Sequence, residues 1–188
     1  MEAGSLVFVT GANGFVASHI IQLLLESGYR VRGSVRDAAK VENLRVKWEN
    51  EFPGKFEAVT VLDISRVDAW EQALRGVAGV VHVASVVSFS PDFDHVVGVA
   101  RDSTVNLLRA AARTSSVRRF VLTSSVVATV LPRPNGPKVR HDAETWNDEA
   151  VRSARGLKED DPFKGLMTRL STSALYASGG LYQVQFAH

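Results

Sequence analysis

The chain has 188 residues, of which 45% are hydrophobic and 22% charged, so it can form about one domain with a proper core. Its net charge is only +2, and no aromatic and basic stripe accompanies the arginines, which argues against nucleic-acid binding. The absence of cysteine excludes disulfides and thiolate metal sites, and without a secretory leader or an apolar run of roughly 20 residues we expect a cytoplasmic protein with no membrane helix.

The first element that the sequence predicts is a strand, and a glycine-rich turn and a helix follow it. Residues 6–9 form an apolar run typical of a buried parallel strand, and residues 10–17 read Thr-Gly-Ala-Asn-Gly-Phe-Val-Ala. Gly11 can take a positive φ, and Gly14 lets the backbone approach a ligand closely. Free N–H groups at the start of the helix favour a phosphate, so the turn predicts a dinucleotide pyrophosphate site. The alternative is an ordinary strand-to-helix turn that happens to hold two glycines.

The alternation of strands and helices then continues along the chain. We expect strands at 29–35, 56–62, 77–84 and 120–123, and helices at 38–51, 67–74 and 94–112. This order predicts an α/β fold with a parallel, doubly wound sheet, in which ligands bind beyond the carboxyl ends of the strands. Polar and small residues fall at those ends, namely Asn13, Arg36, Asp63, Ala84, Ser85, Ser124 and Ser125.

The composition changes in the last third of the chain. Residues 131–137 contain three prolines and predict a loop, and residues 142–155 are polar and partly helical. In residues 167–188 the only Lys, Arg, Asp or Glu is Arg169, and the apolar residues show no firm periodicity. We expect this tail either to pack over the sheet edge or to remain without order.

The residues after the second expected strand predict which dinucleotide binds. An acidic residue at this position accepts a hydrogen bond from the ribose 2′-hydroxyl, whereas an arginine meets a 2′-phosphate. Val35 stands at the acidic position and Arg36 follows it, with Lys40 within reach of the same phosphate. The sequence therefore predicts NADP as the cofactor. The alternative is that Arg36 is a plain exposed residue beside Asp37.

Together these motifs resemble the extended short-chain dehydrogenase/reductases, and more narrowly the dihydroflavonol-reductase-like carbonyl reductases, including the fungal NADPH-dependent aldehyde reductases. Residues 10–17 match the family's Thr-Gly-x-x-Gly-x-x-Gly/Ala loop, and residues 28–36 are similar to its NADP-selecting segment. Residues 63–64 occupy the place of its adenine contact, and residues 81–89 resemble the strand beside the nicotinamide. The resemblance implies a Rossmann-type sheet and these cofactor contacts: Gly11, Asn13, Gly14, Phe15, Val16, Arg36, Lys40, Asp63, Ile64, Val83, Ala84, Ser85 and Thr123.

The resemblance extends to one catalytic residue. Residues 119–125 match the family's strand whose last serine is catalytic, which is Ser125 here, and Trp146 also fits; the match covers about residues 4–166. In that family the serine binds the oxygen of a small carbonyl substrate. A tyrosine donates a proton while hydride arrives from the nicotinamide, and a lysine four residues later lowers the pKa of that tyrosine.

The Tyr-x-x-x-Lys pair expected soon after Leu166 is missing. The tyrosine position falls near Arg169, and no lysine follows Lys164. Tyr176 superficially echoes the family's Tyr-x-Ser, yet the lysine that would activate it is absent. The chain also ends at His188, before the family's later strands and substrate domain. We therefore expect a truncated protein whose sheet is incomplete after the fifth strand.

Two domain-level expectations follow. Residues 1–166 are expected to form a partial NADP-binding domain, and residues 167–188 an atypical tail. The predicted function is NADPH-dependent reduction of an aldehyde or ketone, impaired by the missing pair. The alternatives are a non-catalytic NADP-binding fragment or regulator, and an unstable fragment without activity.

Other chemistries find less support. The five histidines include no short-spaced pair, which argues against a metal site, and His82 in an apolar strand is expected to be a hydrogen-bonded core residue. No Gly-x-Ser-x-Gly elbow supports a serine hydrolase. Ser85, Ser88 and Ser90 either line a substrate pocket or simply end a strand. The sequence makes no prediction of oligomeric state.

Overall fold

The computed structural model describes residues 1–168 except 67, 86–89, 131–139, 141 and 143–144. The described residues form two compact units. The first contains residues 1–84 and 103–123, and the second contains residues 85–102 and 124–168. One boundary falls inside helix α4 (Phe93–Arg113), which contributes a half to each unit.

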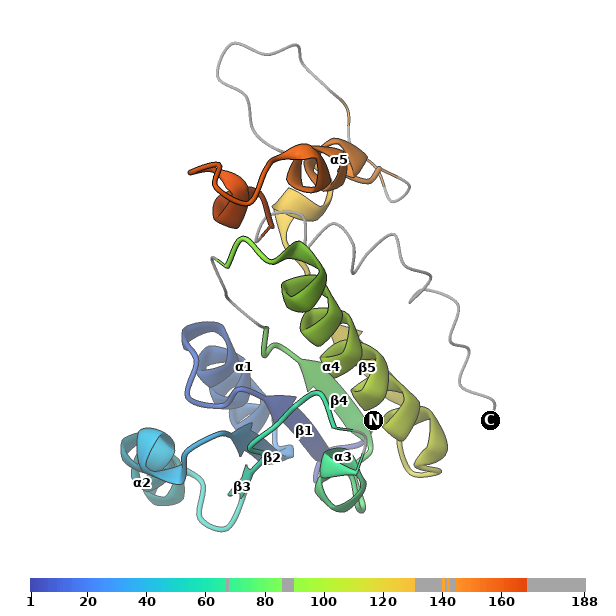
Figure 1. Ribbon diagram of the computed structural model, residues 1–188. Coiled ribbons are helices and arrows are strands. Elements are labelled where there is room, and N and C mark those ends of the chain that lie inside the picture. Colours follow the sequence, from blue (N-terminus) through green and yellow to red (C-terminus); the bar gives the residue numbers. More distant parts are fainter. Residues whose placement is uncertain (67, 86–89, 131–139, 141, 143–144, 169–188) are drawn as a thin grey trace. The chain divides into compact units, whose positions relative to one another are not determined.

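The first unit is built on a five-stranded parallel sheet with the order β3-β2-β1-β4-β5 (Figure 1). The chain enters at the centre, moves outward through β2 to β3, and then returns to the other side of β1. The direction of strand order therefore reverses between β1 and β4, which confirms the predicted doubly wound sheet. The strands are β1 (Leu6–Thr10), β2 (Arg30–Val35), β3 (Phe56–Thr60), β4 (Gly79–His82) and β5 (Arg119–Leu122).

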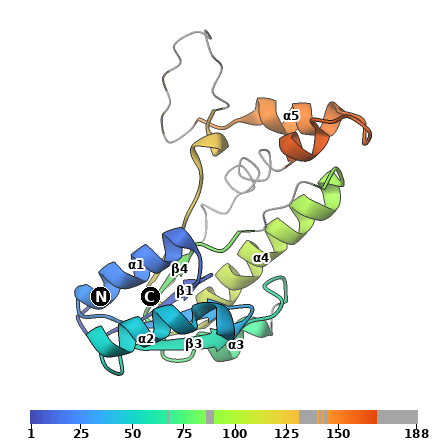
Figure 2. The ribbon, with the colours of Figure 1, turned by 90° about the vertical axis from the view of Figure 1, so that its left-hand side faces the viewer.

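Both faces of this sheet are covered, because side chains in a strand point alternately to opposite faces. Phe8 of β1 packs with Trp70 of α3 (Ala69–Ala73) and with apolar residues of α4. Val9, the next residue, packs on the other face with α1 (Phe15–Glu26) and α2 (Glu42–Glu51). Figure 2 shows β1 and β4 between α1 and α4. This two-sided burial explains the nearly continuous apolar run in the sequence.

Some element boundaries differ from the expected ones. The segment 38–51 is not one helix: a 3₁₀ helix, η1 (Ala38–Val41), precedes α2, because the Asp37 carboxylate accepts a hydrogen bond from Ala39 N at 3.0 Å and caps it. Strand β4 stops at His82 instead of residue 84. The N–H groups of Val83 and Ala84 donate hydrogen bonds to the side chain of Thr10 instead of to the backbone of a neighbouring strand.

The second unit includes the 3₁₀ helix η2 (Val126–Ala128) and α5 (Asp148–Gly156). The Asn147 side chain caps α5 by accepting from Ala150 N at 3.1 Å, and its own amide donates to Val127 O at 2.9 Å. At the other end of α5, the buried Lys164 ammonium donates to Ala154 O and Leu157 O. The partly helical character expected for residues 142–155 is therefore confirmed.

No helix in the part of the chain that the structure describes has the length and apolar character needed to span a bilayer.

Candidate dinucleotide-binding site

The glycine turn between β1 and α1 has the backbone geometry expected from its sequence. Gly11 has φ +72°, in the left-handed region that favours glycine. A Cβ atom at Gly11 would also lie only 3.3 Å from the Ala84 Cβ. Gly14 has an ordinary φ of −77°, but a Cβ there would lie 3.1 Å from Gly11 O. The first glycine is required for its conformation, and the second for its close packing.

The start of α1 presents backbone donors at this turn. Gly14 N donates to Gly11 O, and the first helical bond runs from Ser18 N to Gly14 O. The N–H groups of Phe15, Val16 and Ala17 therefore precede the helical ladder, and no side chain caps this end of the helix. Its first turn contains no acidic residue. Backbone donors and the positive end of the helix dipole together favour an anion here.

Strand β2 holds the turn from one side. Ala12 N donates to Ser34 O at 2.9 Å, and Gly11 N lies 3.4 Å from the Ser34 hydroxyl oxygen. The approach is so close that a Cβ at Gly33 would lie 2.6 Å from the Ala12 Cβ. Gly33 therefore allows the turn to pack against the end of β2.

The segment after β4 holds the turn from the other side. The Thr10 hydroxyl oxygen accepts hydrogen bonds from Val83 N and Ala84 N, both at 2.9 Å. The same oxygen lies 2.8 Å from Nδ1 of His82. These contacts join the carboxyl ends of β1 and β4, where the direction of strand order reverses. Parallel α/β sheets bind ligands at this position.

His82 is a hydrogen-bonded core residue, as its apolar strand predicts. Its ring is almost fully buried, with Thr10 at Nδ1 and the Thr104 hydroxyl 3.3 Å from Nε2. Burial lowers the pKa of His82 to about 4, because the charged imidazolium would lose its hydration. The ring is therefore neutral at physiological pH.

Three arginines lie in or directly after β2, and their surroundings in the structure differ. Arg32 is largely buried, pairs with Glu57 at 2.8 Å and donates to two carbonyl oxygens at the end of α3. Arg30 and Arg36 are exposed at opposite ends of the segment. Arg36 lies just beyond Ser34, the residue to which the glycine turn is bonded, so it is the arginine beside the turn.

The residues next to Arg36 in the sequence leave its guanidinium without an ion-pair partner among the described residues. Val35 is buried in the core, and one oxygen of Asp37 is engaged with Ala39 N. Lys40 is exposed in η1. Within the described ranges, no carboxylate forms an ion pair with Arg36 or Lys40. The two cations are therefore available to an anionic ligand.

The loop after β3 is shaped by Asp63. Its Oδ1 accepts from Ser65 N at 2.9 Å and from the Ser65 hydroxyl at 2.6 Å, and these bonds lower the pKa of the Asp63 carboxyl. Asn106 of α4 donates to Ser65 O and attaches the loop to the helix. Ile64 packs partly buried against the core. The exposed Asp63 thus lies in a loop with a defined conformation.

The remaining predicted cofactor contacts fall at the ends of β4 and β5. Val83 and Ala84 are half-buried directly after β4. Thr123 follows β5, and its N–H donates to His82 O at 3.0 Å. Ser85 is exposed and is the first residue of the second unit.

Of the two predicted catalytic residues, the structure describes Ser125 but not Tyr176. Ser125 belongs to the second unit, is exposed, and caps η2 by accepting from Val127 N at 3.3 Å. Tyr176 lies outside the described residues. The catalytic roles of both residues therefore stay predictions.

Sequence reasoning missed several residues that shape these turns. Ser34 and Thr104 gave no signal, because their partners are distant in the sequence. Asn147 had one: an asparagine followed by Asp148 and Glu149 is typical of a helix N-terminus.

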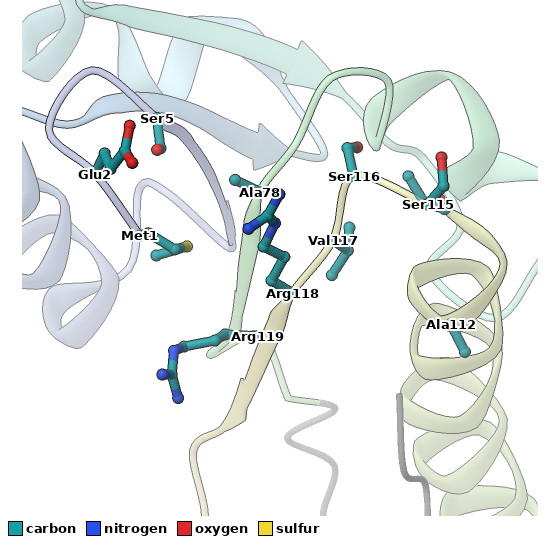
Figure 3. Close-up of a pocket in the computed structure, with 11 residues that line it drawn as sticks. Met1, Glu2, Ser5, Ala78, Ala112, Ser115, Ser116, Val117, Arg118 and Arg119 are labelled. Carbon is teal, nitrogen blue, oxygen red and sulfur yellow. The ribbon is translucent and has the colours of Figure 1, made fainter. Parts of the chain in front are cut away.

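A cavity of about 1100 Å³ lies elsewhere in the first unit (Figure 3). Ser5, Ala78 and Arg118 line it, and they precede β1, β4 and β5 respectively. The cavity therefore lies at the amino ends of the strands, at the opposite end of the sheet from the glycine turn. Across the described residues there is no cluster of His, Cys, Asp and Glu that could hold a metal ion.

A parallel sheet with a glycine turn at the reversal of strand order defines the class of dinucleotide-binding α/β domains. Residues 11–161 match a protein family described as NAD(P)H-binding, and the chain belongs to that family.

The relatives specify the class further. The chain is 52% identical over 166 residues to aldehyde reductase 2 of Sporidiobolus salmonicolor, covering 88% of this chain and 48% of that protein. It is 38% identical over 162 residues to the ketoreductase adrE of Penicillium rubens, covering 81% of this chain and 46% of the relative. The structure also resembles that of yeast methylglyoxal/isovaleraldehyde reductase Gre2 complexed with NADPH, with a TM-score of 0.77, 30% identity and coverage of 95% and 52% of the two chains.

These matches confirm the predicted relationship to the extended short-chain dehydrogenase/reductases. The chain spans about half the length of the curated relatives that it matches.

Proposed function

We propose that the chain is the NADP-binding part of a reductase that transfers hydride from NADPH to the carbonyl group of an aldehyde or ketone. The observation that carries the proposal is Arg36, which is exposed and free of carboxylate partners among the described residues, beside an uncapped glycine turn. Two anion sites on one cofactor, the pyrophosphate and the 2′-phosphate, match these two features.

The first unit would hold the cofactor through its phosphates. N–H groups of Phe15 and Val16 would donate to the pyrophosphate, and the guanidinium of Arg36 would pair with the 2′-phosphate, helped by Lys40. The Val35 side chain offers no acceptor for a ribose 2′-hydroxyl, and one oxygen of Asp37 accepts from Ala39 N. This arrangement favours NADPH over NADH.

The names of the similar proteins also support carbonyl reduction with NADPH as the function. Those described above are named as an aldehyde reductase, a ketoreductase and an aldehyde-reducing enzyme crystallised with NADPH. We infer a small carbonyl compound as the substrate class. Neither the sequence motifs nor the described residues give support for nucleic acid as a partner.

When bound, NADPH supplies the hydride; the chain must supply the proton and polarise the carbonyl. We assign polarisation to the Ser125 hydroxyl, which would donate to the carbonyl oxygen as negative charge develops on it. No lysine after Lys164 is present to lower the pKa of Tyr176 or another tyrosine. A phenol near its reference pKa of about 10 is a poor proton donor and acceptor at neutral pH. We therefore propose weak or absent turnover.

The first experiment measures the affinity of the chain for NADPH and NADH by fluorescence titration. Arg36→Asp is expected to weaken NADPH binding by about 10- to 100-fold, because it replaces a charge-assisted phosphate contact with a repulsion, and to leave NADH binding nearly unchanged. The matched control is Arg30→Asp, which makes the same charge change at the other end of β2 and should affect neither cofactor. Unchanged NADPH affinity in Arg36→Asp contradicts the assignment.

The second experiment separates an enzyme from a binder by following NADPH oxidation with a panel of aldehydes and ketones. The missing Tyr-x-x-x-Lys pair favours a second candidate function, a non-catalytic NADP-binding protein. Turnover on the order of 1–10³ per second would contradict both the expected impairment and this second candidate. Tight NADPH binding without turnover would support the second candidate.

A further inference from the structure

The hydroxyl group of Thr10 makes three contacts, and their directions can be assigned. A hydroxyl has one proton and two acceptor lone pairs. Val83 N and Ala84 N both donate to the Thr10 oxygen and so occupy its acceptor sites. The hydroxyl proton is therefore left for the third neighbour, Nδ1 of His82, at 2.8 Å.

This direction determines the protonation of His82. Because Nδ1 accepts a hydrogen bond from the Thr10 hydroxyl, it carries no proton itself, and the neutral ring must be protonated at Nε2. Nε2 in turn lies 3.3 Å from the Thr104 hydroxyl oxygen, which can accept a hydrogen bond from the Nε2–H group. A chain of donors therefore runs from the two backbone amides through Thr10 and His82 and ends at Thr104 in α4. Its direction cannot be reversed while both amides donate to Thr10.

We propose that His82 is a positioning residue for the dinucleotide: as the Nε2-protonated tautomer it orients the Thr10 hydroxyl, which holds Val83 and Ala84 against the glycine turn. The inference rests on the proposed function, since its purpose is a cradle that binds NADPH. Val83 and Ala84 are predicted cofactor contacts, and the Cβ of Ala84 packs against Gly11. The two sides of the cradle are thus connected through a single hydroxyl.

Loss of the Nδ1 acceptor has a specific consequence. Without it, the buried Thr10 proton must find another acceptor, and the hydroxyl can then no longer accept from both backbone amides. One amide after β4 is released, and the segment can move away from Gly11. Asparagine keeps an acceptor close to the position of Nδ1, whereas leucine fills a similar volume with none.

The test compares His82→Leu, His82→Asn and a control, His95→Leu, an exposed histidine of α4. Folding is verified by circular dichroism and urea unfolding, and NADPH affinity by titration of the folded protein. His82→Leu is expected to weaken NADPH binding about tenfold, and His82→Asn to remain within about threefold of the unaltered chain. His95→Leu should have no effect. A folded His82→Leu that binds as the unaltered chain does, or an Asn variant as weak as Leu, overturns the proposal.

A double-mutant cycle with Thr10→Val tests the connection between the two side chains. Since the valine has no hydroxyl to orient, adding His82→Leu to it should cost little further affinity, whereas additive losses contradict the proposal. Thr10→Ser, which keeps the hydroxyl, serves as the control.

If His82→Leu does not fold, ¹⁵N NMR of the unaltered chain decides, because the proposal requires a bare Nδ1 and a protonated Nε2; a proton on Nδ1 overturns it. Failure of the unaltered chain to bind NADPH would instead contradict the proposed function, and the NMR measurement would still test the tautomer.

Discussion

The glycine turn and the Ser125 turn each follow the carboxyl end of a strand, yet they are held in different ways. The glycine turn is bonded to Ser34 of β2 on one side and to residues after β4 on the other, through buried groups distant in the sequence. Ser125 is exposed, and its side chain accepts a hydrogen bond from Val127 N, two residues ahead. The glycine turn is therefore built into the core of its unit, whereas the geometry at Ser125 depends on local bonds and on Asn147.

The different supports of the glycine turn and the Ser125 turn match the different roles that we propose for them. In the proposed function, the buried supports of the glycine turn would fix the backbone donors that face the phosphates of the cofactor. In the proposed function, the exposed Ser125 hydroxyl would be accessible to a substrate. The glycine turn is held by hydrogen bonds on both sides, whereas the sequence after Leu166 contains no Tyr-x-x-x-Lys pair that could act with Ser125.

The largest expected effect compares a phenylalanine from each unit. Phe8 is 0% exposed and contacts Trp70 edge-on, so Phe8→Ala should lower the free energy of unfolding by about 3–5 kcal/mol. Phe163 is 64% exposed, and Phe163→Ala should change it by about 0.5 kcal/mol or less. Urea unfolding measures both. Equal losses would show that the two units do not differ as described.

The next prediction tests how closely the glycine turn packs on β2. In Gly33→Ala, the new Cβ meets the Ala12 Cβ at 2.6 Å and the Phe56 ring at 3.0 Å, so the variant should lose about 1–3 kcal/mol of stability. Ala12→Gly removes one of these clashes and should restore part of the loss. The control is Gly98→Ala in α4, which meets nothing within 4 Å and should gain about 0.5–1 kcal/mol in helix propensity. A neutral Gly33→Ala would contradict the close approach.

The third prediction concerns acid stability. The pKa of His82 falls from 6.5 in the unfolded chain to about 4 in the folded one, so below pH 6.5 the unfolded state binds a proton that the folded state does not. Its contribution to stability is therefore complete above pH 6.5 and is lost as the pH falls toward 4. Between pH 7 and pH 5 this loss is about 2 kcal/mol.

The measurement is urea unfolding at several pH values for the unaltered chain and for His82→Asn, which has no titrating group there. Subtracting the two profiles removes the contribution of the carboxylates and of the other histidines. Parallel profiles would show that His82 titrates in the folded state as it does in the unfolded chain.

The smallest effect on stability is expected at Ser125. Ser125→Ala removes the cap of a short 3₁₀ turn and should cost about 1 kcal/mol or less, with no change in NADPH affinity. Any carbonyl reduction that the chain performs should fall sharply, while Ser124→Ala leaves it unchanged. A loss of NADPH affinity in Ser125→Ala would mean that Ser125 belongs to the cofactor cradle.

Much of the fold could be predicted because its signals are local. The apolar run of β1, the positive-φ position at Gly11 and the helix that follows lie within a short stretch of sequence, and each residue type has a direct physical reason there. The position of Arg36 at the end of β2 was likewise evident. The division of residues 38–51 into η1 and α2 was not, because the periods of a 3₁₀ helix and an α-helix cannot be told apart over four residues.

The sequence by itself determined the order of strands and helices, the glycine turn, and which side chains fall at strand ends, since all of these depend on neighbours along the chain. Only the tertiary structure decided which strand ends meet. Thr10 and His82 are 72 residues apart, and no local pattern connects them. The placement of β1 between β2 and β4 brings them together and makes Gly33 a site of close approach to Ala12. The pairing of β2 with β3 places Glu57 beside Arg32, whereas Arg36, after the end of β2, has no carboxylate partner among the described residues.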